Sequence, residues 1–182
     1  VVVKSDGSIW FTDPAYGIDA DYEGGKAEPE IGACNVYRID GKSGAVTIVS
    51  DDFERPNGLA FSPDESKLYI ADTGISHRPD GPKHIRVFDV AGGAKLKGGK
   101  VFATCPDGVF DGFRLDEAGR IWTSTASGVL CYDPDGTPIG RVPVPEIVGN
   151  VVFGGPRRNR LYICGQTSLY SMFTLTNGVK TY

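Results

Sequence analysis

Apolar residues along this chain gather in short runs, and polar turn residues separate one run from the next. The runs are rich in β-branched and aromatic residues, and Gly, Pro, Asp and Ser bound them, which is typical of β-strands. We find no convincing stretch with apolar residues at the i, i+3, i+4, i+7 spacing of an amphipathic helix. The pattern therefore predicts an all-β protein.

A unit of two strands and a turn occurs four times, each time with an aromatic residue in the second strand. The four aromatic residues are 59, 53 and 40 residues apart: Trp10, Tyr69, Trp122 and Tyr162. The units are VVVKSDGSIWFTDP (1–14), GLAFSPDESKLYIADT (58–73), GFRLDEAGRIWTSTA (112–126) and NVVFGGPRRNRLYICG (150–165). A third run follows each unit (35–40, 85–90, 129–136, 168–173), and a fourth follows the first three (45–50, 100–105, 140–145).

Four antiparallel strands in every roughly 40 to 50 residues indicate the blades of a β-propeller. A β-sandwich would alternate strands without this ordered repeat, so the propeller is favoured. We interpret residues 1–182 as one partial propeller domain of about four blades. The variable spacing is confined to two segments, 17–34 and 74–84, which we expect to be loops on one face.

The first strand of each propeller blade lines the central channel, and its start lies near one mouth of that channel. Asn57, Asp111 and Asn150 stand at or just before the start of these strands. We therefore expect the three polar side chains to converge at one mouth. Aligned repeats favour Asp111 over Asp107, because Asp111-Gly112 precedes its strand as Asn57-Gly58 does.

Carboxylate and amide oxygens suit hard cations such as Ca²⁺, Mg²⁺ or Mn²⁺ better than metals that prefer thiolate or imidazole. Asn-Gly and Asp-Gly are also common turn dipeptides, so a turn role for Asn57 and Asp111 stays open. Asp13, followed by a proline, has the same two readings, as a turn residue or as a group beside the mouth. His77 and His84 lie in a Gly/Pro-rich segment, where a loop role is favoured and a rim contact with substrate is the alternative.

Composition and charge narrow the function. With 40% apolar and 23% charged residues the chain is an ordinary globular protein, and its net charge of -4 includes no long block of one sign. Nucleic acid and membrane are therefore not expected partners. The four cysteines have no metal-ligand spacing and are expected to be free thiols. Nucleophile-elbow, phosphate-loop and HExxH motifs are absent, so metal-assisted hydrolysis is the natural reaction class for an enzyme.

Four segments together resemble the gluconolactonase / senescence-marker-protein (regucalcin-like) family. They are GSIWFTDPAYGI (7–18), RPNGLAFSPDESKLYIADT (55–73), PDGVFDGFRLDEAGRIWTS (106–124) and NVVFGGPRRNRLYI (150–163). The resemblance implies a six-bladed propeller and a divalent-metal-dependent hydrolase that opens sugar lactones. It also implies that Asn57, in Pro-Asn-Gly, and Asp111, in Asp-Gly, are metal ligands. Asp111 would in addition be the catalytic residue that activates or orients water.

Two family features fall outside the chain. A first-blade Glu ligand and a substrate-contacting Pro-Asn-Asp motif would both precede Val1, and six blades need roughly 270 residues. The resemblance therefore implies the C-terminal two-thirds of a longer protein. We expect the isolated chain to bind metal weakly, to be inactive, and to expose blade faces that favour dimerisation or a homo-oligomer.

The leading function is a sugar-lactone hydrolase acting on a small-molecule lactone, with Ca²⁺ as the first choice of metal and Mg²⁺, Mn²⁺ or Zn²⁺ as alternatives. An organophosphate or aryl-ester hydrolase at the same metal site, or a non-catalytic calcium-binding propeller, stays open. We expect Asp13 and Asn150 to line the substrate pocket, with Tyr16 and His77 as further substrate contacts at its entrance. Tyr22 is a third candidate for the rim of this entrance. We expect a soluble protein, and the sequence leaves cytoplasmic and exported locations open.

Overall fold

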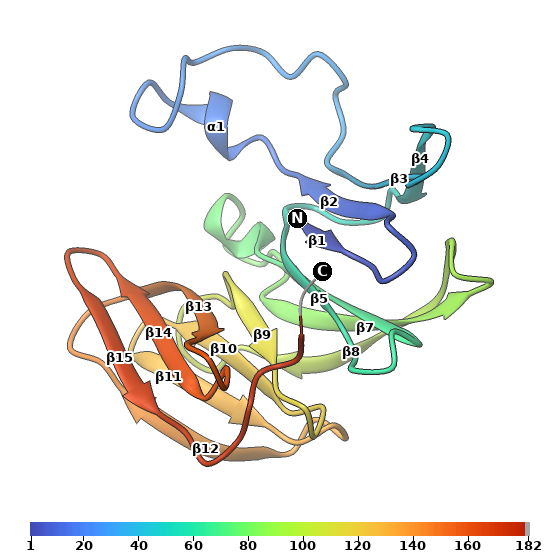
Figure 1. Ribbon diagram of the computed structural model, residues 1–182. Coiled ribbons are helices and arrows are strands. Elements are labelled where there is room, and N and C mark those ends of the chain that lie inside the picture. The colour runs from blue at the N-terminus through green and yellow to red at the C-terminus, as the bar shows by residue number, and fades with distance from the viewer. Residues whose placement is uncertain (181–182) are drawn as a thin grey trace.

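The computed structural model describes residues 1–180 as four antiparallel sheets set around a common centre (Figure 1). Blade 1 contains β1 (Val2–Val3), β2 (Ile9–Asp13), β3 (Asn35–Ile39) and β4 (Val46–Ser50), in that order. Blade 2 contains β5 (Pro56–Phe61), β6 (Lys67–Asp72), β7 (His84–Ala91) and β8 (Lys95–Thr104). The all-β prediction and the repeat are thus confirmed for the first two blades.

Blades 3 and 4 follow the same order. Blade 3 contains β9 (Phe113–Leu115), β10 (Ile121–Thr125), β11 (Gly128–Tyr132) and β12 (Pro138–Pro143). Blade 4 contains three strands, β13 (Val148–Gly154), β14 (Arg160–Gly165) and β15 (Leu169–Phe173). The predicted propeller with about four blades is confirmed, and β1, β5, β9 and β13 are the inner strands (Figure 1).

The two variable segments contain short helices that the sequence pattern did not predict. They are the α-helix α1 (Tyr16–Asp19) and the 3₁₀ helix η1 (Gly74–Ser76). His84 was expected in the second of these loops, but it is the first residue of β7 and pairs with Asp72. Within residues 1–180, no helix is both long and apolar enough to cross a bilayer.

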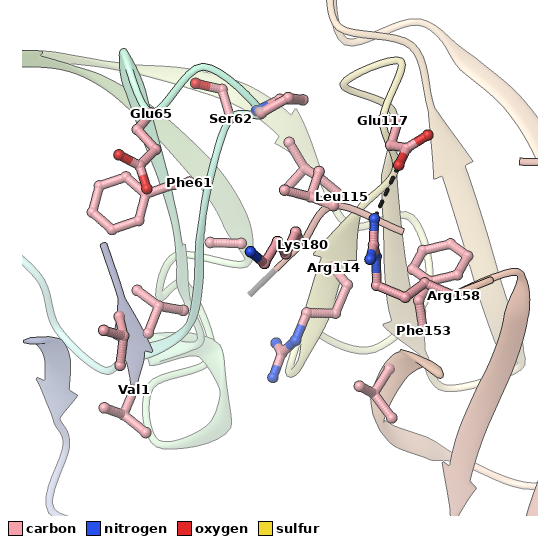
Figure 2. Close-up of a pocket in the computed structure, with 16 residues that line it drawn as sticks. Val1, Phe61, Ser62, Glu65, Arg114, Leu115, Glu117, Phe153, Arg158 and Lys180 are labelled. Atoms are coloured by element: carbon pink, nitrogen blue, oxygen red, sulfur yellow. Dashed lines mark hydrogen bonds and ion pairs between the residues drawn. The ribbon is translucent and has the colours of Figure 1, made fainter. Parts of the chain in front are cut away.

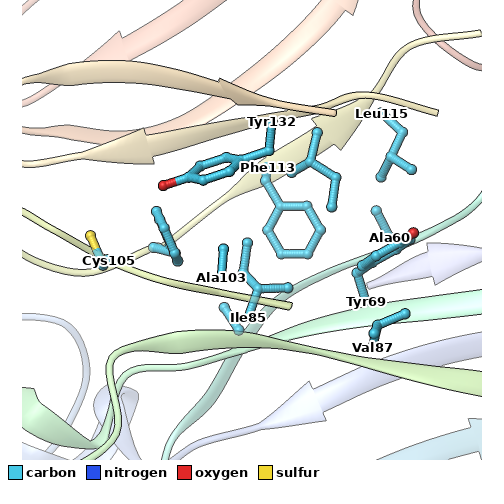
Figure 3. Close-up of a cluster of buried hydrophobic side chains, with 12 residues drawn as sticks. Ala60, Tyr69, Ile85, Val87, Ala103, Cys105, Phe113, Leu115 and Tyr132 are labelled. Carbon is cyan, nitrogen blue, oxygen red and sulfur yellow. The ribbon is translucent and has the colours of Figure 1, made fainter. Parts of the chain in front are cut away.

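Hydrophobic cores form between neighbouring blades, because both faces of each sheet carry apolar residues. In β6, Leu68 and Ile70 pack toward blade 1, whereas the intervening Tyr69 and the following Ala71 pack toward blade 3. Alternate residues of a strand point to opposite faces, so one strand contributes to two cores. Figure 3 shows the core between blades 2 and 3, where Phe113 of β9 faces residues of blade 2. Each fully buried aliphatic side chain contributes about 1.5 to 3 kcal/mol.

The C-terminal segment returns to the centre of the propeller after β15. Gly178 forms an isolated antiparallel bridge with Asp116, next to the inner strand of blade 3. The amide of Val179 donates to the carbonyl of Leu115 at 3.0 Å, and the amide of Gly178 donates to the carbonyl of Arg158 at 2.7 Å. This segment therefore joins blades 3 and 4 beside the channel.

Candidate functional site

Asn57 lies within a strand. It is the second residue of β5, and the following Gly58 is the third. Neither Gly58 nor Gly112 has the positive φ that a glycine-dependent turn requires. The turn role that the Asn-Gly dipeptide allowed is therefore wrong for Asn57. Asp111 lies just before β9, at the same end of the neighbouring blade.

A series of hydrogen bonds crosses from blade to blade at this end of the channel. Thr12 Oγ1 of blade 1 donates to the carbonyl of Asn57 at 2.8 Å. The amide of Gly58 donates to the carbonyl of Asp111 at 3.1 Å, and the amide of Gly112 donates to the carbonyl of Gly149 at 2.9 Å. These contacts bring the first residues of three inner strands together around one mouth, as the repeat predicted.

The two glycines allow this close approach. A Cβ atom on Gly58 would lie 2.1 Å from the carbonyl oxygen of Asp111, and one on Gly112 would lie 2.2 Å from Asn150 Oδ1. No side chain fits at such distances without displacing the neighbour. Glycine therefore follows Asn57 and Asp111 because the next blade packs directly against the backbone there.

Asn150 occupies a different repeat position from the expected one. Gly149 accepts the amide of Gly112 as Asp111 accepts that of Gly58, so Gly149 is the equivalent of Asp111. Strand pairing agrees, because the partners of the second-strand aromatic residues, Ala60, Arg114 and Val152, each lie three residues after Asn57, Asp111 and Gly149. The exposed Asn150 side chain instead lies over Gly112, and its Oδ1 accepts the amide of Val151 at 2.8 Å.

The Asp111 carboxyl group is largely removed from water. Burial raises its pKa from 3.8 to about 6, a hydrogen bond from the Asn57 side chain opposes this rise, and the Glu23 charge adds to it. Asn57 and Asp111 are therefore neighbours, as predicted. Glu23 belongs to the 17–34 segment, and the sequence analysis did not single it out. A buried carboxylate with a second carboxylate in electrostatic range favours a cation between or beside them.

The rim of this mouth is formed by the two variable segments, which are bonded to each other. Tyr16 Oη lies 2.7 Å from Thr73 Oγ1 and 2.8 Å from Ser76 Oγ. Asp19 forms an ion pair with Arg55 at 2.8 Å, and its Oδ2 also lies 3.0 Å from His77 Nε2. The rings of Tyr16 and His77 also lie in contact, with centroids 5.5 Å apart.

Thr73 connects this rim to Asn57. Its Oγ1 accepts a long hydrogen bond, 3.5 Å, from Asn57 Nδ2, and the threonine itself is buried. Its amide donates to the carbonyl of Arg55 at 3.0 Å, which fixes the backbone before Asn57. The structure thus brings Tyr16 and His77 together. Tyr16 is linked to Asn57 through Thr73, whose Oγ1 lies within hydrogen-bond distance of both side chains. Thr73 was not among the predicted site residues.

Asp13 and Tyr22 lie farther from this network. Asp13 is the exposed last residue of β2. Together with Arg55 and Glu54 it lines a hollow of about 740 Å³ next to the 17–34 segment. Tyr22 is 95% exposed and buries almost nothing against the protein. Among residues 1–180, no three His, Cys, Asp or Glu side chains are grouped so that they could hold a metal ion.

The sequence of this chain matches one family model and is similar to proteins named as lactonases. The family model described as "SMP-30/Gluconolactonase/LRE-like region" matches residues 1–167. The lactonohydrolase oryL of Aspergillus oryzae is 30% identical over 181 residues, which covers 90% of this chain and 41% of that protein. The pentonolactonase XacC of Haloferax volcanii is 35% identical over 133 residues, covering 70% of this chain and 43% of its own.

Solved structures give the same picture of the fold. A gluconolactonase from Xanthomonas campestris superposes with a TM-score of 0.85 at 38% identity, covering 93% of this chain and 54% of its own. Regucalcin from Agrobacterium tumefaciens, described as a calcium-binding protein, has a TM-score of 0.73 at 24% identity and covers all of this chain and 61% of its own. The chain therefore spans about two fifths of the length of the two curated relatives described above.

Proposed function

Because this chain belongs to the SMP-30/gluconolactonase/LRE-like family, we propose that it is part of a metal-dependent hydrolase that opens sugar lactones. The observation that carries the proposal is the proximity of the Asn57 side chain to the half-buried Asp111 carboxyl group at the channel mouth. Relatives named as lactonases from a fungus and an archaeon support the reaction class. The ring-opening of a lactone is hydrolysis of a cyclic ester.

The residues at the mouth fit a divalent metal ion. Asp111 supplies a carboxylate and Asn57 a neutral amide, both hard oxygen donors that suit Ca²⁺ or Mg²⁺. Ca²⁺ is our first choice, in keeping with the calcium-binding regucalcin of the same fold. The Asn57 side chain lies close enough to Asp111 to lower the pKa of that carboxyl group, and its Nδ2 donates to Thr73 Oγ1 at 3.5 Å.

A bound metal ion would supply Lewis-acid polarisation of the lactone carbonyl at this mouth. The chain's own residues would carry out the proton transfer. Ionised Asp111 accepts a hydrogen bond from water and takes up the proton at a carboxylate oxygen as the water oxygen bonds to the lactone carbonyl carbon. It returns this proton to the ring oxygen when the ring C–O bond breaks. Burial raises the pKa of Asp111 to about 6, so the carboxyl group is a stronger base than an exposed aspartate and is still ionised at neutral pH.

The surrounding residues position these two groups. Thr73 limits the rotation of the Asn57 amide, and Gly58 holds the Asp111 backbone against β5. The rim formed by Tyr16 and His77 covers the mouth from the side of the 17–34 segment. We propose that this rim, with Asp13 and Asn150 on either side, determines which lactone enters.

The test combines metal titration and turnover. Calcium binding is measured by calorimetry and glucono-1,5-lactone hydrolysis by pH-stat titration, both with the full-length gene product. We expect Asp111→Asn to lower kcat by at least about a hundredfold, which is typical for loss of a general base. Asp107→Asn, which removes an exposed carboxylate from the preceding loop, should leave kcat and metal affinity unchanged.

Three outcomes would contradict the proposal. Full lactone turnover in Asp111→Asn would remove Asp111 from the mechanism. Calcium binding without turnover of any lactone would instead indicate a non-catalytic calcium-binding propeller. Turnover of a phosphotriester or aryl ester, but of no lactone, would show that the same site serves a different hydrolase.

A further inference from the structure

Another cavity lies toward the opposite end of the inner strands from Asn57 and Asp111. It has a volume of about 420 Å³ and is bounded by residues of all four inner strands and by the returning C-terminal segment (Figure 2). This volume falls in the range of about 300 to 1,000 Å³ that small-molecule sites occupy. Arg114, which lines it, is three residues beyond Asp111 and therefore about 10 Å farther along the chain direction. The proposed lactonase site does not use this cavity.

Most of the cavity wall is hydrocarbon. Leu115, Val152, Phe153 and Val179 are contributed by β9, β13 and the C-terminal segment. Val2 and Ala60 complete it from blades 1 and 2. A ligand with an apolar body would gain about 25 cal/mol for each Å² of such surface that it covers. A polyhydroxylated body would lose hydrogen bonds to water that these side chains cannot replace.

One guanidinium group points into this apolar space. Figure 2 shows the Arg114 side chain directed into the cavity, away from the pair formed by Glu117 and Arg158. Its Nη1 donates to the carbonyl of Phe113 at 2.7 Å. Among residues 1–180, no carboxylate forms an ion pair with Arg114. An arginine has five N–H donors, so most of them lack a protein acceptor here.

The carboxylates of the cavity wall are already bonded to other groups. Glu117 pairs with Arg158 at 3.1 Å, and Glu65 pairs with Lys4 at 3.1 Å. Burial lowers the pKa of Arg114. This shift means that the cavity disfavours an unpaired positive charge. A bound anion would relieve this, since a buried charge is stable only when it is paired.

We propose that this cavity binds a small monocarboxylate with an apolar body, its carboxylate on Arg114 and its hydrocarbon against the inner strands. A guanidinium group matches a carboxylate in a two-pronged arrangement, and one such pair neutralises a single arginine. The apolar wall favours a carboxylate on a hydrocarbon body over inorganic phosphate, which has no apolar surface to bury. The ligand class differs from a sugar lactone or its product, so the proposal stands independently of the proposed enzyme.

The probes are hexanoate, hexanamide, gluconate and inorganic phosphate, each titrated into the 182-residue chain by calorimetry. Hexanamide has the hydrocarbon without the charge, and gluconate has the carboxylate without the apolar body. We expect hexanoate to bind at least about tenfold more tightly than the other three, as a charge-assisted pair in apolar surroundings requires. Equal binding of hexanamide, gluconate or phosphate would overturn the proposal.

Two arginine variants locate the site. Arg114→Gln should weaken hexanoate binding by about tenfold or more. Arg157→Gln is the matched control, because it removes the same charge from an exposed arginine that does not line the cavity. Intermolecular NOEs between the hexanoate methyl group and the Phe153 ring in the unaltered chain give a readout that does not depend on variant folding. Absence of these NOEs at saturating hexanoate, or full binding by a folded Arg114→Gln chain, would refute the site.

Discussion

The electrostatics of Asp111 predict that the metal-free chain is destabilised by its own candidate ligand. Burial raises the pKa of Asp111 from 3.8 to about 6 in the folded chain, whereas the unfolded chain keeps the ordinary value. Between these values the folded state binds the proton that the unfolded state releases, so folding stability falls as pH rises. Each pKa unit is worth about 1.4 kcal/mol, which gives a loss of about 3 kcal/mol at pH 7.

Substitution of Asp111 by asparagine removes this titration while keeping the shape of the side chain. At pH 7 and with EDTA present, Asp111→Asn should therefore raise the free energy of unfolding by up to about 3 kcal/mol. At pH 4, where Asp111 is protonated in the folded chain, the same substitution should have little effect. Other carboxyl groups titrate in both proteins, so the difference between the two curves isolates Asp111.

The assay is urea unfolding followed by circular dichroism at several pH values from 4 to 8, in EDTA and again with excess calcium. Asp107→Asn is the control for loss of one exposed negative charge, and it should give a nearly constant difference across this range. With calcium the order should reverse, because binding to the folded state stabilises only the protein that keeps the ligand. A stability gain in Asp111→Asn that is equal at pH 4 and pH 7 would refute the electrostatic argument.

Two further substitutions test the residues that position Asn57 and Asp111. Gly58→Ala would place a methyl group 2.1 Å from the Asp111 carbonyl, so it should lower the free energy of unfolding by about 1 to 3 kcal/mol and weaken calcium binding. Gly25→Ala, which has no atom within 4 Å, should change neither, and equal losses in both variants would contradict the steric explanation. Tyr16→Phe removes the hydroxyl group next to Thr73 and should cost about 0.5 to 1.5 kcal/mol in thermal or urea unfolding. If Tyr16→Phe leaves lactone specificity unchanged, the proposed role of the rim is wrong.

The repeat and its inner strands could be predicted from the sequence because each hairpin carries the same order of apolar run, turn and aromatic residue. The equivalence of Asn57 and Asp111 followed from this order and agrees with the cross-blade hydrogen bonds. Asn150 was placed one residue out of register, because it was aligned by the start of its apolar run, whereas the pairing of Tyr162 with Val152 makes Gly149 the equivalent of Asn57. Its side chain lies over Gly112, although Asn150 is not the residue that corresponds to Asp111.

The contribution of the 17–34 segment could not be predicted, and the reason is physical. This segment has no periodic pattern, so its sequence does not indicate which groups turn toward the channel. Its position follows from contacts made at its start, where Tyr16 bonds to Thr73 and Asp19 pairs with Arg55. Those contacts bring Glu23 into electrostatic range of Asp111, from a position 88 residues earlier in the chain.

Glu23 therefore affects the site through charge, and its effect has a definite sign. A second carboxylate near Asp111 makes the metal-free mouth more negatively charged and less stable when both groups are ionised. The same arrangement increases attraction for a divalent cation, since both negative charges then act on one positive ion. A loop that destabilises the metal-free mouth thus strengthens the preference for the metal-bound form. Glu23→Gln removes this charge, and it should both lower the Asp111 pKa and weaken calcium binding. If the variant changed only the pKa or only the calcium affinity, the two effects would be separate.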